Sequence, residues 1–153
     1  MSRIILLDSS PLELITNPRP HPEAQACKQW LATLLSDGLQ FLESEIADYE
    51  VRRELLRANK GRGLHNLDAL KTQIGYLPLN TATMQQAALF WARLRQQGIP
   101  TANVAALDGD VILAAQALQL IAQGDDAIIA TSNVDHLSRL VPAQRWQDIS
   151  SVS

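Results

Sequence analysis

Hydrophobic residues first occur as a continuous run near the N-terminus. Residues 3–7 are apolar apart from Arg3, and Asp8 ends the run. A strand with one exposed face alternates apolar and polar residues, whereas a strand covered on both faces does not. We therefore expect residues 3–7 to form a buried strand of a parallel sheet. Three further short apolar segments are predicted strands: residues 39–42, 76–79 and 127–130.

Helical periodicity separates these strands. Three prolines at alternating positions make residues 17–22 a loop, Ser44 is a predicted N-cap, and Gly61 and Gly63 are expected to end the helix that Ser44 begins. Residues 146–149 are a candidate edge strand. The predicted helices cover residues 23–36, 45–60 and 65–74, a segment from Thr81 or Thr83 to Gly98, residues 110–122, and a short stretch near 134–140.

Strands that alternate with helices predict an α/β protein with three layers and a mainly parallel central sheet. We expect residues 1–153 to form one domain of this kind. In such sheets ligands bind at the carboxyl ends of the strands. The segments to search for chemistry are therefore those after Leu7, Leu42, Leu79 and Ala130.

Composition excludes several classes of protein. A chain of 153 residues is about one domain, and its single cysteine, Cys27, allows neither an internal disulfide nor a cysteine-rich zinc site. The net charge of −3 means that any nucleic-acid binding must come from a local basic patch. The N-terminal apolar run is too short for a signal peptide or a membrane span, so we expect a cytoplasmic protein with no membrane contact.

Acidic residues stand where the predicted strands end and the predicted helices begin. Asp8 directly follows residues 3–7, where an Asx cap of the next turn is the simpler explanation. Asp108 and Asp110 open the most apolar helix, where either is equally well explained as a cap or as a first-turn acid favoured by the helix dipole. One helix start needs only one such acid, so the pair suggests a further role.

Three more candidate residues also have simpler structural explanations. Glu50 lies mid-helix beside the apolar face, and an ion pair with Arg53 is the commoner role of such a residue. Asn133 and Asp135 follow the predicted strand over 127–130, where helix capping is the simpler explanation. Each signal is weak alone, but together they predict a group of oxygen ligands at one edge of the sheet.

Oxygen ligands without a Cys/His cluster suit Mg²⁺ or Mn²⁺ better than Zn²⁺. Such a metal site is typical of enzymes that cleave phosphodiester bonds with an activated water. Two other classes are disfavoured. Ser9 and Ser10 follow Asp8, so the Asp-x-Asp of haloacid-dehalogenase-type phosphatases is missing, and no glycine-rich dinucleotide motif is present.

The order of these motifs resembles the PIN domain, the metal-dependent ribonuclease fold of many bacterial toxin–antitoxin toxins. A strand ending in Asp occurs at residues 5–10, and an acid on a helix at residues 46–55. A third acid opens a small-residue helix at residues 110–117, and a Thr-x-Asn follows a strand at residues 130–133. The motifs cover nearly the whole chain, and the third is the most specific.

The resemblance implies a role for each candidate. Asp8 and Asp110 would bind the metal, and Glu50 would complete a catalytic acidic cluster. Many PIN domains have Asp where this chain has Asn133, which supplies no charge. One Mg²⁺ is therefore favoured over two, with Asn133 beside the ligands rather than among them, and Asp108 or Asp135 is a candidate to replace the missing charge.

The function that follows is a Mg²⁺-dependent endoribonuclease, the toxin of a toxin–antitoxin pair. Its partners would be RNA, an antitoxin segment that covers the acidic groove and, as PIN domains often dimerise, a second copy of the chain. The alternative is an RNA-binding module that keeps the fold without cleavage. Asn133 favours that alternative, whereas the presence of Asp8, Glu50 and Asp110 argues against it.

Basic residues cluster near Glu50, at Arg52, Arg53, Arg57, Lys60 and Arg62. A solvated helix face with local ion pairs is the simpler explanation, and RNA phosphate binding is the functional one. Arg53 is also a candidate to orient Glu50. Thr131 and Ser132 are a second candidate for phosphate contact, against a simpler role as helix caps.

Overall fold

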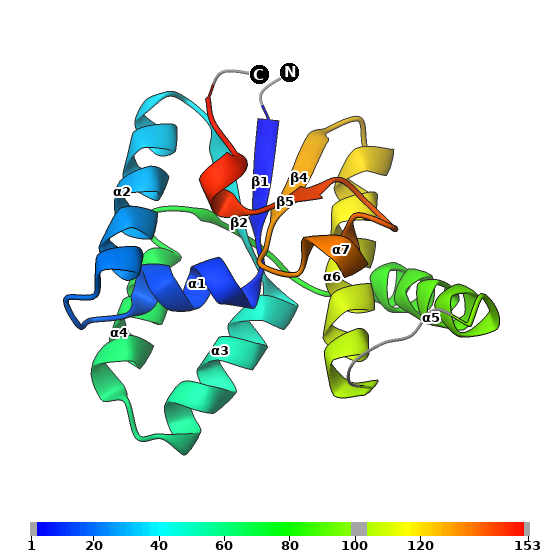
Figure 1. Ribbon diagram of the computed structural model, residues 1–153, viewed down its shortest axis with the longest axis horizontal. Coiled ribbons are helices and arrows are strands. Elements are labelled where there is room, and N and C mark those ends of the chain that lie inside the picture. The colour runs from blue at the N-terminus through cyan, green and yellow to red at the C-terminus, as the bar shows by residue number, and fades with distance from the viewer. Residues whose placement is uncertain (1–2, 99–103, 152–153) are drawn as a thin grey trace.

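A five-stranded sheet forms the centre of the computed structural model, which describes residues 3–98 and 104–151 (Figure 1). Every pair of neighbouring strands is parallel, in the order β3-β2-β1-β4-β5. The predicted α/β architecture is confirmed, and the four predicted strands occur with shifts of a few residues at their ends. The strands are β1 (Arg3–Leu7), β2 (Gln40–Ser44), β3 (Gly75–Leu77), β4 (Asp126–Ala130) and β5 (Ala143–Gln144).

Helices cover both faces of the sheet (Figure 1). One layer consists of α1 (Ser9–Thr16), α2 (Pro22–Ser36), α3 (Glu45–Arg57) and α4 (Gly61–Leu70). The other consists of α5 (Thr81–Gln96), α6 (Val104–Ala122) and α7 (Val134–Leu137). Among the described residues, no helix is long and apolar enough to cross a membrane.

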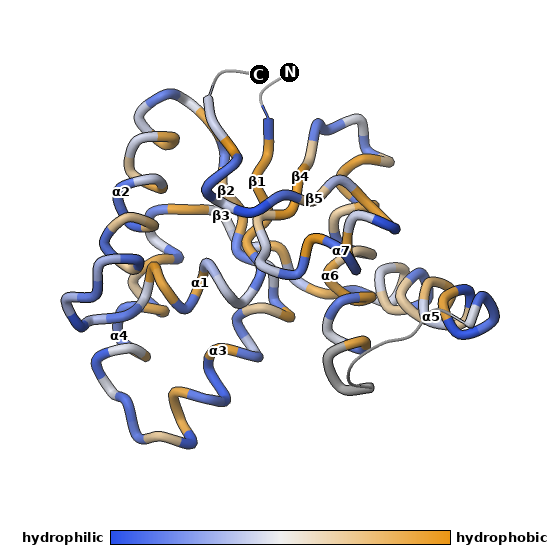
Figure 2. The backbone as a smooth tube through the Cα atoms, in the orientation of Figure 1, coloured by the Kyte–Doolittle hydropathy of each residue, from blue (hydrophilic) through white to orange (hydrophobic). Residues whose placement is uncertain are grey.

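The two faces of β1 explain why its sequence does not alternate. Ile5 and Leu7 pack into the core on the α1–α4 side, while Ile4 and Leu6 pack into the core on the α5–α7 side. Each of these four residues is buried, so every one of these positions favours an apolar side chain. Figure 2 shows the hydrophobic residues concentrated along the strands and the inner helix faces.

The helix α1 is missing from the sequence prediction. Residues 9–11 were expected to form a turn, but the helix begins at Ser9, and the side chain of Asp8 caps it by accepting from the backbone N–H of Ser9. Pro11 falls in the first turn, where the lack of an N–H costs no helical hydrogen bond. The cap expected at Asp8 is therefore present.

The boundary between α3 and α4 also differs from the prediction. The helix expected over 45–60 ends at Arg57, and Asn59 turns the chain with a φ of 55°. Gly61 and Gly63 lie in the first turn of α4 and do not end α3. The observed α4 begins and ends four residues earlier than the helix expected over 65–74. Gly63 lies so close to α3 that a Cβ on it would come within 2.7 Å of the Leu55 side chain. Tight packing of the two helices explains this glycine.

Two further boundaries are corrected. The helix expected over 110–122 begins at Val104, so neither Asp108 nor Asp110 is its N-cap or a first-turn acid. The edge strand expected at 146–149 is instead a 3-10 helix, Trp146–Asp148, and the ring of Trp146 packs on the ring of Trp30. Gly98 ends the α5 segment with a φ of 65°, and the two residues predicted to follow it, 99–100, lie outside the described residues.

The order in which the chain adds strands to the sheet reverses at β1. From β1 it proceeds outward to β2 and β3, and it then returns to the other side of β1 as β4. The carboxyl ends of β1 and β4 therefore lie side by side at a topological switch point, where open α/β sheets bind their ligands.

Candidate functional site

Asp8 leaves the carboxyl end of β1 at this switch point. It is only 8% exposed, and its backbone N–H donates to the carbonyl of Ala130 at 3.0 Å. Its Oδ1 accepts from the N–H of Ser9 at 2.7 Å, and its Oδ2 accepts from the hydroxyl of Thr131, also at 2.7 Å. The carboxylate is thus held in one orientation by the ends of both central strands.

A chain of hydrogen bonds links Asp8 to Asp110 on α6. The hydroxyl of Thr131 accepts from the backbone N–H of Asn133 at 2.8 Å. The side-chain amide of Asn133 donates to Oδ2 of Asp110 at 2.7 Å. These hydrogen bonds bring together residues from three separate segments, and Asp8 and Thr131 are 123 positions apart in the sequence.

Glu50 enters the same region from the opposite helical layer. It lies on α3, and its carboxylate packs against Gly109 of α6, where an added Cβ would come within 2.6 Å of Oε2. The next residue along α6 is Asp110. Asp8, Glu50 and Asp110 thus meet at one edge of the sheet, from a strand end and from two helices on opposite faces.

The electrostatics of the site agree with this proximity. Burial raises the pKa of Glu50 to about 7, and the charges of Asp8 and Asp110 add to the effect, while Arg53 opposes it. Burial likewise raises the pKa of Asp110 to about 7, together with the charge of Asp8 and against the Asn133 hydrogen bond. Carboxylates that repel one another in a poorly solvated place are costly to ionise.

Burial also raises the pKa of Asp8, although the hydrogen bonds from Thr131 and Ser9 lower it. The three acids therefore form a site that favours either protonation or a nearby positive charge. A divalent cation is the simplest source of such a charge in a cluster of oxygen ligands.

The donor set fits Mg²⁺ or Mn²⁺ in kind. Both ions prefer carboxylate oxygen, and Mg²⁺ commonly takes one or two carboxylates with waters completing its shell. Asp8 and Asp110 supply two such carboxylates, tied to each other through Thr131 and Asn133. Within residues 3–98 and 104–151, no group of three or more Asp, Glu, His and Cys side chains is arranged to hold a metal ion.

Comparisons with known proteins find similarity in structure. No protein-family model and no curated protein matches the sequence. Of the solved structures, VapBC-1 from nontypeable Haemophilus influenzae has a TM-score of 0.68 at 20% identity, over 95% of this chain and 99% of that one. VapBC2 from Rickettsia felis, bound to a DNA fragment from its promoter, has a TM-score of 0.69 at 17% identity, over 94% and 98%. DNA-bound VapBC from Salmonella typhimurium has a TM-score of 0.65 at 16% identity, over 95% and 99%.

The chain has a PIN-like fold. The likeness extends over almost all of the chain and almost all of each neighbour, so it concerns the path of the whole backbone. The resemblance that the sequence motifs indicated is thereby confirmed for the fold. The roles assigned to the individual residues remain predictions.

The other predicted site residues occupy varied places in the PIN-like fold. Asp108 and Asp135 are exposed, unlike Asp110. The backbone N–H of Ser132 donates to the hydroxyl of Ser10 at 3.1 Å. His136 approaches Asp110, with 3.8 Å between Nδ1 and Oδ2.

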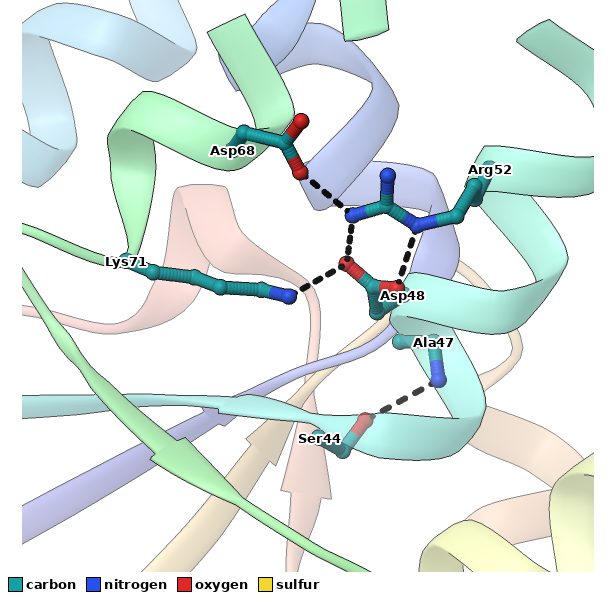
Figure 3. A network of polar contacts seen from close by, with 6 residues as sticks. All are labelled: Ser44, Ala47, Asp48, Arg52, Asp68 and Lys71. Carbon is teal, nitrogen blue, oxygen red and sulfur yellow. Dashed lines mark hydrogen bonds and ion pairs between the residues drawn. The ribbon is translucent and has the colours of Figure 1, made fainter. Parts of the chain in front are cut away.

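The three arginines differ in their surroundings. The guanidinium of Arg53 lies over the ring of Tyr49, 5.1 Å from its centroid. Arg57 is paired with Glu54 three residues earlier, at 2.9 Å. Arg52 belongs to a network at the base of α3 (Figure 3), where it donates to both oxygens of Asp48, at 3.0 and 3.1 Å, and to Asp68 of α4 at 2.7 Å.

Beside this network lies a buried acid that is absent from the predicted site. Glu43, the residue before Ser44 on β2, is fully buried, and its carboxyl group lies beside that of Asp48. Burial and the neighbouring Asp48 raise its pKa to about 8. For Asp48, the hydrogen bonds with Arg52 and Glu43 and the charges of Arg52 and Lys71 outweigh burial and lower the pKa. A charged residue in an otherwise apolar strand, FLES, is the sequence signal that points to it.

Gly109 is a second residue of the site that the motifs did not indicate. A glycine inside a strongly helical sequence costs stability and usually has a packing reason. That reason is the carboxylate of Glu50.

Proposed function

We propose that this protein is a Mg²⁺-dependent endoribonuclease that hydrolyses RNA phosphodiester bonds. One observation carries the proposal. The acids Asp8, Glu50 and Asp110 converge at the switch point of a PIN-like fold, and the pKa of each is raised. Three acids in this state lower the stability of the fold when they ionise, whereas they are well suited to hold a cation beside a phosphate.

Each residue of the site has a distinct role in this proposal. Asp8 and Asp110 would hold Mg²⁺, or Mn²⁺ in its place, which when bound neutralises charge on the phosphate and acidifies water. Thr131 and Asn133 fix the orientation of these two carboxylates by hydrogen bonds. Glu50, with a pKa of about 7, is suited to accept a proton at its carboxylate near neutral pH.

We further propose that the protein is the toxin of a toxin–antitoxin pair. The support is its likeness to VapBC complexes, which are toxin–antitoxin pairs. An antitoxin segment that places a cationic side chain among the three acids would relieve their repulsion and exclude the metal. This partner would therefore bind more tightly to the metal-free protein than to the metal-loaded one.

A cleavage assay on mixed single-stranded RNA tests the nuclease. We expect cleavage by the parent with Mg²⁺ or Mn²⁺ and none with EDTA. Asp110→Asn should abolish cleavage, while Asp37→Asn, an exposed acid at the C-terminal end of α2, should leave it unchanged. A parent that binds RNA but never cleaves it, with either metal, would support the alternative of an inactive RNA-binding module. Asn133 in place of a fourth acid is the feature that would then explain the missing activity.

A further inference from the structure

A groove of about 980 Å³ lies between α1 with the loop that follows it and the hairpin of α3 and α4. In Figure 1 these elements form the lower left of the molecule, on the side opposite α5. The charged side chains along the groove are four cations, Arg19, Arg57, Lys60 and Arg62, and two carboxylates, Glu13 and Glu54.

The groove is a positive region on a negative protein. Four cations outnumber two carboxylates in its lining, whereas the chain as a whole has a net charge of −3. The cations are exposed, and the two carboxylates are within reach of two of them. Arg57 pairs with Glu54, and the charge of Lys60 partly offsets the rise in the pKa of Glu13 that burial and Glu54 cause. Exposed ion pairs are worth at most about 1 kcal/mol, so these cations remain available to a stronger anion.

One face of α3 connects the groove to the acidic site. Glu50, Glu54 and Arg57 follow one another at intervals of four and three residues, so they lie on the same side of the helix. A rise of about 1.5 Å per residue puts Arg57 roughly 10 Å along the axis from Glu50. Glu13, on the opposite wall of the groove, also lies between the two regions. Burial raises its pKa, and the charges of Glu54 in the groove and of Asp8 in the acidic site raise it further.

We propose that this groove binds the phosphate backbone of single-stranded RNA and leads it to the acidic site. Phosphate groups would be contacted by Arg19, Lys60 and Arg62. Arg57 would release Glu54 and pair with a phosphate instead. The inference rests on the proposed nuclease function, since a chain whose phosphodiester bond lies at Asp8 and Asp110 must leave the site along the surface. The groove is a basic path on the same face of α3 as Glu50.

Charge and position favour RNA over a protein segment as the occupant. Between the charged groups the walls include apolar side chains, Leu14, Pro18 and Leu55. A positively charged groove that follows the backbone is one part of sequence-tolerant binding to single strands, and these apolar surfaces can contact bases without selecting among them. An acidic peptide would also satisfy the cations, and poly-glutamate as a competing probe distinguishes the two.

Fluorescence anisotropy with a labelled single-stranded RNA of mixed sequence tests the groove directly. EDTA in the buffer prevents cleavage, so that only binding is measured. The test variant is Lys60→Ala/Arg62→Ala. The matched control is Arg93→Ala/Arg95→Ala, which removes the same charge from the last turn of α5, on the opposite side of the molecule (Figure 1). The melting temperatures of both variants are measured as well, to verify that each variant is folded.

We expect the groove variant to bind RNA more weakly and with a flatter salt dependence, by a slope of about 0.7 for each phosphate that the two removed cations neutralise in the parent. The control should match the parent. Equal affinity and equal slope in all three proteins would overturn the inference, as would a groove that binds poly-glutamate and not RNA. A parent that cleaves neither RNA nor bis(4-nitrophenyl) phosphate with Mg²⁺, yet has a groove variant with weaker RNA affinity, would refute the nuclease and uphold the groove.

Discussion

The Oε2 atom of Glu50 lies so close to the backbone of Gly109 that a Cβ on residue 109 would come within 2.6 Å of it. This contact joins α3 and α6, which pack on opposite faces of the sheet and meet beyond the ends of β1 and β4. The absence of a side chain at residue 109 lets the carboxylate of Glu50 lie next to Asp110. Glycine is therefore a requirement of the site at this helical position, not of the helix.

Gly109→Ala should separate activity from stability. The added methyl group pushes the Glu50 carboxylate aside, and a shift of about 1 Å at a reacting group can cost about a hundredfold in rate. Helix propensity alone favours Ala by about 1 kcal/mol, so the melting temperature should be unchanged or higher. RNA cleavage and thermal melting measure the two effects. Gly61→Ala is the control for melting, because a Cβ there meets nothing within 4 Å. A Gly109→Ala variant that cleaves RNA as fast as the parent would contradict the prediction.

Removing one acid should stabilise the metal-free protein. Asp110 has a pKa of about 7, so at pH 8 it is ionised at a cost that its unfolded form does not bear. Asp110→Asn keeps an oxygen for the Asn133 amide and should raise the free energy of unfolding at pH 8, in EDTA, by about 1 to 3 kcal/mol. Mg²⁺ should raise the melting temperature of the parent and not of the variant. Lower stability of Asp110→Asn would show that its charge supports the fold.

Glu43 should make stability fall as the pH rises. Its pKa is about 8 in the folded protein, against an ordinary value of 4.5, so the folded state holds a proton that the unfolded state has lost between these values. The decrease in stability begins near pH 4.5 and is complete above about pH 8. Glu43→Gln lacks this titration, so its free energy of unfolding should rise steadily relative to that of the parent over this pH range. Denaturant unfolding at several pH values measures the difference, and parallel curves would contradict the prediction.

The network around Asp48 should contribute more to stability than the exposed ion pair between Arg57 and Glu54. Asp48 has a side chain only 9% exposed, and Arg52 donates to both its oxygens. Arg52→Ala leaves that carboxylate to Lys71 alone and should lower the free energy of unfolding by about 1 to 3 kcal/mol. Arg57→Ala breaks the exposed pair with Glu54 and should cost less than about 1 kcal/mol. Urea unfolding of both variants tests the ranking, and equal destabilisation would contradict it.

The sequence by itself determined the layers and most of the elements. A strand buried on both faces needs apolar residues at every position, and residues 3–7 show that requirement directly. Ser44 was recognisable as an N-cap because capping depends only on the residue type and its neighbours in sequence. Asp8 was recognisable as a candidate because it follows a strand whose carboxyl end lies at the ligand-binding edge of a parallel sheet, and Glu50 and Asp110 because their motifs resemble those of the PIN domain.

Only the tertiary structure decided what these residues contact. The α1 helix, which begins with Ser9 and Ser10, has no amphipathic pattern long enough to predict it, and it is stabilised by packing on α2 and α3. The links from Asp8 through Thr131 and Asn133 to Asp110, and from Glu50 to Gly109, join segments far apart in the chain. Local patterns specify secondary structure because their interactions span only a few residues. Distances between side chains depend on how whole helices pack, and that is settled by the complete core.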